Sequence, residues 1–111
     1  MDGEKNLLGM IGICRGARAT VIGTALVCEE LRRRGKGYPH ILVVEASDSS
    51  DNTHKKITDK CLYYNARHVR LSVDSTALGR AVGKTAVSVV AIVGEHFCRA
   101  VAGKLPGIDE Q

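Results

Sequence analysis

The stretch Ile41-Leu42-Val43-Val44-Glu45-Ala46-Ser47-Asp48-Ser49-Ser50-Asp51-Asn52-Thr53 decides the fold class of this 111-residue chain. It begins with four consecutive apolar residues, a pattern typical of a strand that is covered on both faces. The polar residues 47–53 follow as a loop that can cap a helix. Apolar side chains at helical spacing, including Ile57, Cys61 and Tyr64, then predict a helix over residues 52–65. The stretch therefore predicts a buried strand that leads through a polar loop into a helix.

The same alternation continues on both sides of this stretch. Helices are predicted over residues 6–16, 24–34, 75–82 and 95–102, and further strands over residues 19–22, 68–73 and 87–93. The last strand is the most regular, whereas Arg70 interrupts the one before it. Gly35 and Gly83 are expected to end two of the helices, and Ser75 to cap the helix that begins there. Alternating helices and strands predict an α/β fold, a three-layer α/β/α sandwich around a largely parallel sheet.

Length and composition fit one small globular domain over residues 1–111. A chain of this length is near the commonest domain size, and 44% hydrophobic with 25% charged residues are ordinary values for a folded protein. Because the chain has one Phe and no Trp, its core must be built from Val, Ile, Leu and Ala. The tail over residues 103–111 contains Pro106 and Gly107 and is expected to be frayed.

The four cysteines are widely spaced and none forms the Cys-x-x-Cys pair of a zinc ribbon, so no bound metal or cofactor is expected. The first residues, Met1-Asp2-Gly3-Glu4-Lys5, are polar and lack the apolar stretch of a signal peptide. The longest apolar stretch, residues 86–93, is far shorter than the roughly 20 residues needed to span a bilayer. These features predict a soluble cytoplasmic protein, without a membrane partner, whose cysteines are reduced core residues.

Residues 79–85, Gly-Arg-Ala-Val-Gly-Lys-Thr, resemble a phosphate-binding P-loop at first sight. A P-loop has four residues between its glycines and lies between a strand and a following helix. Here three residues separate Gly79 from Gly83, and a predicted helix precedes the motif while a strand follows it. A nucleotide site is therefore not expected.

Other polar side chains do not combine into a catalytic site. His54 and Cys61 are seven residues apart, roughly 10 Å along a helix, which is too far for one metal ion. Cys61 is therefore interpreted as a core residue and His54 as a solvated residue in the first turn. His96 and Cys98 are two residues apart and face different directions on a helix. The sequence thus predicts no catalytic residues and no enzyme.

The chain is mildly basic, with 16 Lys and Arg against 12 Asp and Glu and a net charge of +4. That balance is compatible with a nucleic-acid partner, but many unrelated proteins share it. The run Arg32-Arg33-Arg34 could equally offset the dipole at the end of a helix, and Lys55, Lys56 and Lys60 could form a solvated helix face. Both alternatives stay open.

Three predicted loops point to a binding surface. In an alternating α/β sheet such loops gather at one edge, which here should bring together Gly23, residues 48–52 and residues 83–88. Gly23 allows a backbone to approach closely, and helix N-termini at this edge can hold phosphate oxygens. Lys84 and Thr85 would add a positive charge and a hydroxyl group. We expect this edge to be the binding surface.

The order of several motifs resembles a known protein family. The motifs are Leu7-Leu8-Gly9, Val21-Ile22-Gly23, Asp51-Asn52-Thr53-His54-Lys55-Lys56-Ile57-Thr58-Asp59-Lys60-Cys61 followed by Tyr64-Asn65, Leu78-Gly79-Arg80-Ala81-Val82-Gly83-Lys84, and Val89-Val90-Ala91-Ile92-Val93 before Phe97. With these motifs, which extend over nearly the whole chain, the sequence resembles the ribosomal L-seven-Ae/L-thirty-e family, in particular its small bacterial YlxQ-type branch. The resemblance implies a three-layer α/β/α sandwich with a four-stranded mixed sheet.

The resemblance also implies a function. Members of the family recognise kink-turns, which are sharply bent RNA helices, as parts of ribosomes or other RNA–protein particles. They hold the RNA through the start of the second helix, the loop before the third helix and the loop before the last strand. Their signature at the second helix is Gly, any residue, Asn or Lys, Glu or Gln, two further residues and Lys. This chain keeps Gly23 but has Ala25, Leu26 and Glu29 at the other signature positions.

Together these features predict a monomeric, non-enzymatic RNA-binding protein whose partner is a structured, kink-turn-like RNA of the ribosome or another particle. The expected RNA-binding residues are Gly23, Thr24, Ala25, Asp48, Lys84, Thr85, Val87, Arg15, Arg18 and Arg80. The alternative is a protein–protein adaptor that keeps the fold but has lost RNA recognition, which the apolar Ala25 and Leu26 favour. If these two side chains instead pack within the fold, they favour neither function.

Overall fold

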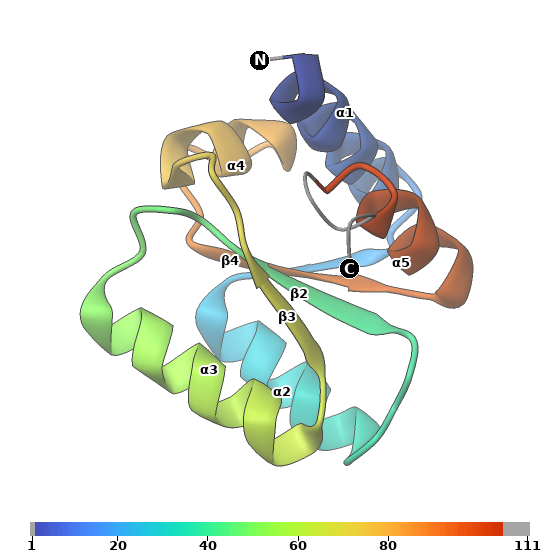
Figure 1. The fold of residues 1–111 in the computed structure, drawn as a ribbon, viewed down its shortest axis with the longest axis vertical. Helices are drawn as coiled ribbons and strands as arrows, with labels where there is room; N and C mark the ends of the chain where they lie inside the picture. The colour runs from blue at the N-terminus through green and yellow to red at the C-terminus, as the bar shows by residue number, and fades with distance from the viewer. Residues whose placement is uncertain (1, 106–111) are drawn as a thin grey trace.

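A computed structural model describes residues 2–105 of the chain, in which helices and strands alternate as the sequence predicts (Figure 1). The elements are, in chain order, α1 (Asp2–Gly16), β1 (Thr20–Ile22), α2 (Thr24–Arg34), β2 (Ile41–Glu45), α3 (Asp51–Tyr64), β3 (Arg67–Arg70), α4 (Ser75–Ala81), β4 (Val89–Val93) and α5 (Glu95–Ala102). The four apolar residues that begin β2 are buried as predicted, and the fifth, Glu45, is buried as well. The polar loop after β2 caps α3, because the hydroxyl of Ser50 accepts a hydrogen bond from the amide of Thr53 at 3.2 Å.

The four strands form one mixed sheet in the order β1-β4-β2-β3. Only β2 and β3 pair in parallel, whereas β4 runs antiparallel to both of its neighbours. The four-stranded mixed sheet implied by the family resemblance is therefore confirmed, and the largely parallel sheet expected from alternation alone is wrong. The reason lies in α4, which stays at the end of the sheet where β3 stops, so that β4 starts from that same end (Figure 1).

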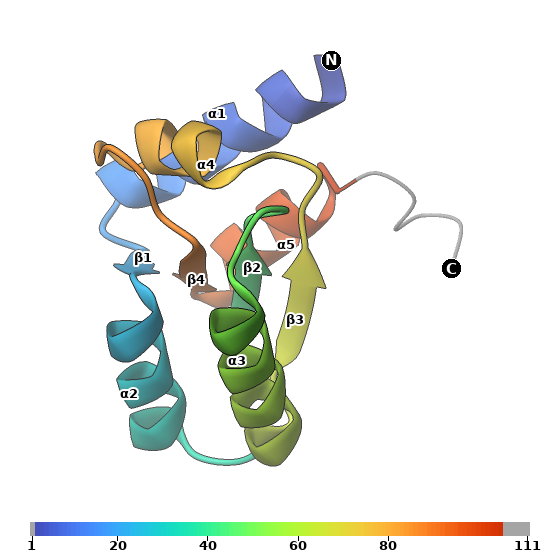
Figure 2. The same ribbon diagram turned by 90° about the vertical axis from the view of Figure 1, so that its left-hand side faces the viewer.

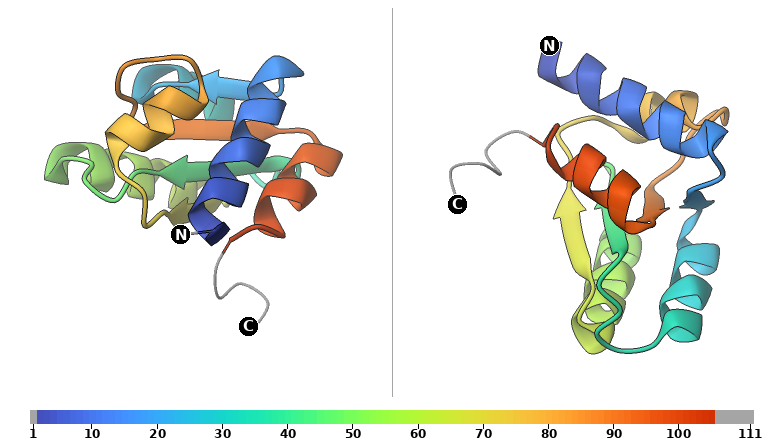
Figure 3. Two further views of the ribbon diagram at one scale, coloured as in Figure 1. Left: turned by 90° about the horizontal axis from the view of Figure 1, so that it is seen from above. Right: turned by 90° about the vertical axis from the view of Figure 1, so that its right-hand side faces the viewer.

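Helices cover both faces of the sheet and give the predicted three-layer α/β/α sandwich. α1, α4 and α5 lie on one face, and α2 and α3 lie side by side on the other (Figure 2, Figure 3). Successive side chains of β2 enter opposite layers of the core. Leu42 and Val44 contact the layer of α1, α4 and α5, whereas Ile41 and Val43 contact the layer of α2 and α3. The central strands thus belong to both halves of the core.

Several element ends differ from the predicted ones. α4 begins at Ser75 but is capped by Asp74, whose carboxylate accepts a hydrogen bond from the amide of Ala77 at 2.9 Å. β3 ends at Arg70 and β4 begins at Val89, so both strands are shorter than predicted. Leu71 and Ser88 still form hydrogen bonds to Glu45 and Ala46, and beyond them the chain turns toward α4. The amide of Val87, for example, donates to the carbonyl of Ser75 at 2.9 Å.

The cysteines are placed largely as expected for core residues. Cys14 and Cys61 are buried and Cys28 and Cys98 are half-buried, all four as free thiols. Burial raises the pKa of Cys61 to about 12 and that of Cys98 to about 11, so both thiols stay protonated at neutral pH.

The last described residue, Leu105, lies inside the core. Leu105 is buried against the layer of α1, α4 and α5, so the fraying predicted from residue 103 does not begin there. The rest of the predicted tail, residues 106–111, lies outside the described residues. Within residues 2–105, every helix is too short or too polar to cross a membrane.

Candidate functional site

The three predicted loops meet at one end of the sheet (Figure 2). Since β4 runs opposite to β1 and β2, its first residues lie next to the last residues of those two strands. The amide of Gly23 donates a hydrogen bond to the carbonyl of Val89 at 2.9 Å, and the amide of Ala46 donates to the carbonyl of Ser88 at 2.8 Å. We call the region formed by residues 23–26, 46–50 and 83–88 the loop edge, within which Ala46 and Val87 are buried beneath the surface. The loops gather as predicted, but an antiparallel β4 brings them together.

The first turn of α2 faces solvent at the loop edge. Gly23 precedes the helix with a φ of 102°, a conformation that favours glycine. Thr24 is half-buried, whereas Ala25 and Leu26 are exposed, Leu26 by 61%. Packing within the fold therefore does not explain Ala25 and Leu26. The first amides of a helix have no partner within it, so those of α2 are available to an anion at this surface.

Asp48 connects two elements of the loop edge. Its carboxylate accepts hydrogen bonds from the amide of Ser75 at 2.8 Å and from the hydroxyl of Ser75 at 3.2 Å. The loop after β2 is thereby tied to the start of α4. Part of the acceptor capacity of Asp48 is used inside the protein, which suits a residue that shapes the surface.

The loop before β4 packs tightly against α4. A Cβ at Gly79 would lie 2.7 Å from the Cα of Ala86, so only glycine allows the helix and the loop to approach this closely. Lys84 and Thr85 are exposed on this loop. Val87, by contrast, is buried in the core, and its amide is bonded to Ser75, so it does not line the surface.

The three arginines expected to contact phosphates lie in different places. Arg15 is exposed in the last turn of α1, and its guanidinium lies beside Gly83, 3.0 Å from the position that a Cβ would take there. Arg18 is exposed in the turn between α1 and β1, with a left-handed φ of 61°. Arg80 borders a separate hollow between α1 and α4. Of the three, Arg15 is the one in contact with the loop edge.

A groove of about 520 Å³ adjoins the loop edge between β1 and α2. It is lined by Thr20, Val21, Ile22, Leu26, Glu29, Glu30, Arg33 and Lys84. β1 is at the border of the sheet, so one side of its backbone faces this groove without a neighbouring strand. The groove therefore carries both signs of charge, from Glu29, Glu30, Arg33 and Lys84, and Lys84 also belongs to the loop edge.

A buried carboxylate lies directly behind the loop edge, and sequence reasoning missed it. Glu45, the last residue of β2, is fully buried. His54 Nδ1 donates to its carboxylate at 2.9 Å, His68 Nε2 donates at 2.8 Å, and Ser49 Oγ donates a further hydrogen bond. The Nε atom of Arg70 lies 3.8 Å from the same carboxylate. We call these five residues the Glu45 cluster.

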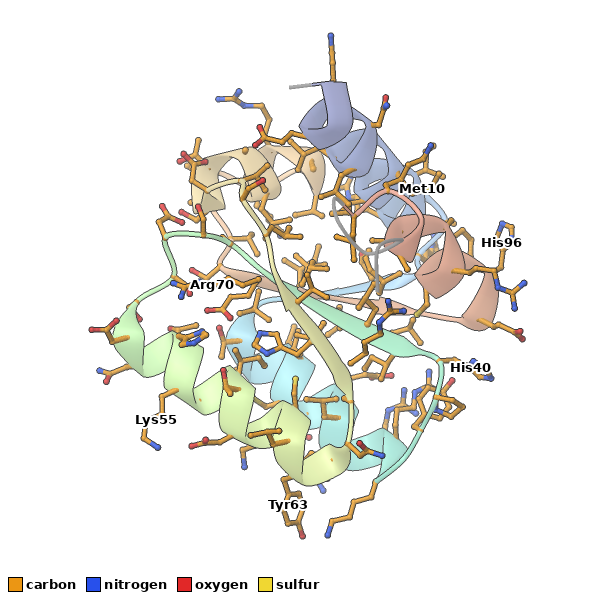
Figure 4. All side chains as sticks on the ribbon, viewed as in Figure 1. Met10, His40, Lys55, Tyr63, Arg70 and His96 are labelled. Carbon is orange, nitrogen blue, oxygen red and sulfur yellow. The ribbon has the colours of Figure 1, made fainter. Side chains whose placement is uncertain are left out.

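Hydrogen bonds keep Glu45 ionised. Burial by itself would raise the pKa of the Glu45 carboxyl, but the hydrogen bonds from Ser49, His54 and His68 outweigh it and hold the pKa below its ordinary value. Arg70 lies at the end of the sheet near the loop after β2 (Figure 4) and donates to the carbonyl of Ser47 at 3.1 Å. The Glu45 cluster therefore holds the loop that carries Asp48 in one conformation.

The interpretation of His54 as a solvated first-turn residue is correct only in part. Its side chain is 41% exposed, but its ring is also bonded to the buried carboxylate of Glu45. The sequence did contain a signal. Glu45 directly extends an apolar strand, and His68 and Arg70 alternate in the next strand with the period of one sheet face. The ring nitrogens lie within hydrogen-bond distance of the carboxylate itself, and no metal-binding set of three His, Cys, Asp or Glu occurs in the described part of the chain.

The sequence and the fold of this chain are similar to those of known proteins. No protein-family model matches the chain. It is 42% identical over 90 residues, 79% of this chain and 83% of the relative, to the RNA-binding protein YlxQ of Bacillus subtilis (strain 168). Its fold is similar to that of a protein with unknown function from Bacillus halodurans C, with a TM-score of 0.78, 28% identity, and coverage of 93% of this chain and 96% of that one. A 15.5kD RNA binding protein of Giardia lamblia shares the fold with a TM-score of 0.72 at 18% identity, over 99% of this chain and 90% of that one.

Proposed function

This chain belongs to the YlxQ-type branch of the ribosomal L-seven-Ae/L-thirty-e family, and from this membership we propose that it binds structured RNA without catalysing a reaction. The relative from Bacillus subtilis is named an RNA-binding protein. In this chain the proposal depends above all on one observation, the convergence of three loops at the loop edge. These are the loops through which, by resemblance, members of the family hold RNA.

The loop edge offers what a phosphate backbone needs. The N-terminus of α2 presents amides and the positive end of a helix dipole. Lys84 and Arg15 add cations at the loop before β4, and Gly23 lets a sugar or phosphate come close to the backbone. We expect RNA to be bound here mainly through phosphates and backbone amides, which fix the position of an RNA without reading its bases.

Kink-turn RNA is the proposed ligand, recognised by its shape. Ala25 and Leu26 occupy the positions where the family signature has polar side chains, and neither can donate or accept a side-chain hydrogen bond. Recognition of the bent RNA by shape and phosphate contacts does not need that pair. We propose that the protein acts as a monomer in the cytoplasm on a kink-turn of ribosomal RNA or of another RNA–protein particle.

Binding to a kink-turn RNA and to an unkinked duplex of equal length, each over a series of salt concentrations, tests this function. Tight binding to the kinked RNA alone is the expected result. Equal binding to both RNAs with a steep salt dependence would indicate general attraction to phosphate instead. No binding to either RNA at moderate salt would refute the proposal.

A charge-reversal variant locates the binding surface. Arg15→Glu combined with Lys84→Glu should weaken binding to the kink-turn at least about tenfold and lower the salt dependence, because two phosphate contacts become repulsive. Lys5→Glu with Lys104→Glu makes the same change in net charge at exposed positions outside the loop edge and is the matched control. Equal losses in both double variants would show that net charge, and not the loop edge, governs binding.

A protein–protein adaptor remains the second candidate, and the exposure of Leu26 favours it. Leu26 is 61% exposed and lines the groove between β1 and α2. Its neighbour β1 has a free edge to which an extended peptide could add as a strand. The adaptor function is favoured if the protein binds neither the kink-turn RNA nor the duplex but binds a protein partner, and if Leu26→Asp abolishes binding to that partner.

A further inference from the structure

α3 carries a second cationic surface, which the loop edge does not include. Lys56, Lys60 and Tyr64 are spaced four residues apart and therefore lie in one row along the helix. With Asp59 and Tyr63 they line a groove of about 580 Å³, which we call the α3 groove. Lys56 and Lys60 are exposed. The sequence left open whether these lysines bind a nucleic acid or form a solvated helix face. The first alternative requires that their charges are available to a ligand.

The lysines of the α3 groove are available. Among residues 3–105, no carboxylate lies within 4.0 Å of the Lys56 or Lys60 ammonium group. The one carboxylate of the groove, Asp59, is instead bonded to Lys55 at 3.0 Å. A solvated helix face typically pairs its charges at a spacing of four residues, as Lys55 and Asp59 do. Lys56 and Lys60 depart from that pattern.

A second aromatic ring, that of Tyr63, lies in the α3 groove beside the end of this row. Tyr63 is 60% exposed and projects from the end of α3 away from the sheet (Figure 4). The ammonium group of Lys36 lies 4.2 Å from the centre of its ring, and the ring of Tyr64 lies 4.8 Å away at 86°. A cation over an exposed ring contributes only about 0.5–1 kcal/mol, so Lys36 can move aside and leave the ring face to a nucleobase.

The α3 groove and the loop edge lie along the same helix. Ser50, which caps the N-terminus of α3, belongs to the loop edge. At a rise of 1.5 Å per residue, Lys56, Lys60 and Tyr63 follow at roughly 9, 15 and 20 Å along the helix. An RNA strand that leaves the loop edge along α3 would therefore meet two free cations and then an exposed aromatic ring.

We propose that the α3 groove binds a single-stranded RNA segment that flanks the structured RNA at the loop edge. Lys56 and Lys60 contact its phosphates, and Tyr63 stacks on one of its bases, a combination that holds single strands without reading their sequence. The proposal rests on the proposed function. It commits to RNA because lysine is depleted at protein–protein interfaces, whereas unpaired lysines beside an exposed ring suit a nucleic acid.

Four RNA probes test the proposal: a blunt kink-turn RNA, the same RNA with a short oligouridine extension at one end, the same RNA with that extension at the other end, and the oligouridine alone. The protein should bind one of the extended RNAs about tenfold more tightly than the blunt RNA. Lys56→Ala with Lys60→Ala, and separately Tyr63→Ala, should abolish this gain and leave binding to the blunt RNA unchanged. Tyr63→Phe should retain the gain, because it keeps the ring.

The controls separate this proposal from the proposed function. Lys5→Ala with Lys104→Ala removes the same charge elsewhere and should keep the gain. Absence of binding to the blunt RNA would count against the loop edge. The α3 groove is tested separately by the oligouridine alone, which should bind to the wild type and lose that binding in the groove variants. The groove proposal is overturned if neither extension improves binding, or if the lysine and tyrosine variants keep the gain. If the wild type binds a protein partner and only the groove variants lose it, the α3 groove is a protein-binding surface and the RNA proposal is wrong.

Discussion

Glu45 places a carboxylate in the layer of α2 and α3, where an unpaired charge would be strongly unfavourable. Its hydrogen bonds to Ser49, His54 and His68 satisfy the carboxylate, and Arg70 lies close by. His54 comes from α3, and His68 and Arg70 come from β3, so a single charge on β2 joins three elements behind the loop edge. The stability of the loop after β2, which carries Asp48, therefore depends on whether Glu45 is ionised.

Glu45→Gln should lower the free energy of unfolding by about 1–3 kcal/mol at neutral pH, since it weakens charge-assisted hydrogen bonds in a buried site. The pKa of Glu45 is lowered in the folded protein, so its contribution is present above its ordinary value of 4.5 and is lost as the pH falls through the folded value. The wild type should therefore lose stability on acidification more steeply than the variant. Urea unfolding at neutral pH and at a series of pH values below 4.5 measures both effects.

Glu29→Gln is the matched control for this prediction. Glu29 pairs with Arg32 at 2.6 Å, but both side chains are exposed, and such pairs contribute little. We expect a change of at most about 0.5 kcal/mol and an acid dependence parallel to that of the wild type. If Glu45→Gln also runs parallel to the wild type, the buried carboxylate is not the group that couples stability to acid.

Single residues differ in how far the sequence could predict them. Gly23 and Lys84 were predicted at the loop edge because a local signal, a glycine or a lysine between two elements, marks their position. His54 and His68 reach Glu45 across 9 and 23 residues of chain, and their meeting depends on how α3 is rotated on the sheet. Val87 has the same local signal as its neighbours, yet burial turns its side chain into the core.

Among the elements, helices and strands were predictable and their pairing was not. The apolar run of β2 and the glycine after α2 are local signals, so hydrophobic periodicity and helix capping are enough to predict these elements. The position of β4 between β1 and β2 depends on contacts between distant segments, such as the pairing of Ala91 with Val21 on one side and with Val43 on the other. Alternation alone therefore predicted a parallel sheet, and the resemblance to a family supplied the mixed one.

α2 is the element in which this chain departs from its family, and its sequence can be changed back. Ala25→Asn, Leu26→Glu and Glu29→Lys together restore the family signature at exposed positions, so the core is untouched. Each restored base-reading contact contributes about 1–3 kcal/mol, so affinity for a kink-turn RNA should rise at least about tenfold. Affinity for an unkinked duplex should rise much less. Titration of both RNAs at one salt concentration measures the difference.

The single change Glu29→Lys separates specific contacts from charge. It adds the same net charge as the glutamate-to-lysine part of the triple variant and should improve binding to both RNAs alike, with a steeper salt dependence. A triple variant that gains equally for kinked and unkinked RNA would mean that α2 does not read the kink in this protein, and that the loop edge binds RNA in a different orientation from the family.

The whole molecule has two half-cores that share one sheet. β2 and β4 send alternate side chains into both: Leu42, Val44, Val90 and Ile92 into the layer of α1, α4 and α5, and Ile41, Val43, Val89 and Ala91 into the layer of α2 and α3. Neither layer can lose its helices without exposing one face of these strands to water. The two half-cores should therefore unfold together.

Leu7→Ala tests this coupling, because Leu7 is buried in one layer while the tyrosines report on the other. The chain has no Trp, and its three tyrosines, Tyr38, Tyr63 and Tyr64, lie on or against α2 and α3. Leu7→Ala should cost about 2–5 kcal/mol, as for other buried leucines. The urea midpoint of tyrosine fluorescence should fall by the same amount as that of far-ultraviolet circular dichroism.

Ile57→Ala, in the layer of α2 and α3, is the reciprocal variant, and it should also shift both signals together. Coincident midpoints in both variants mean that damage on one face of the sheet is felt on the other, since β2 and β4 transmit it. If Leu7→Ala lowers the dichroism midpoint but leaves tyrosine fluorescence at its wild-type midpoint, α2 and α3 are held by their own layer alone. In that case the α3 groove would belong to a unit whose stability is independent of α1, α4 and α5. The loop edge would still depend on both units, because Asp48 and Ala86 tie it to α4.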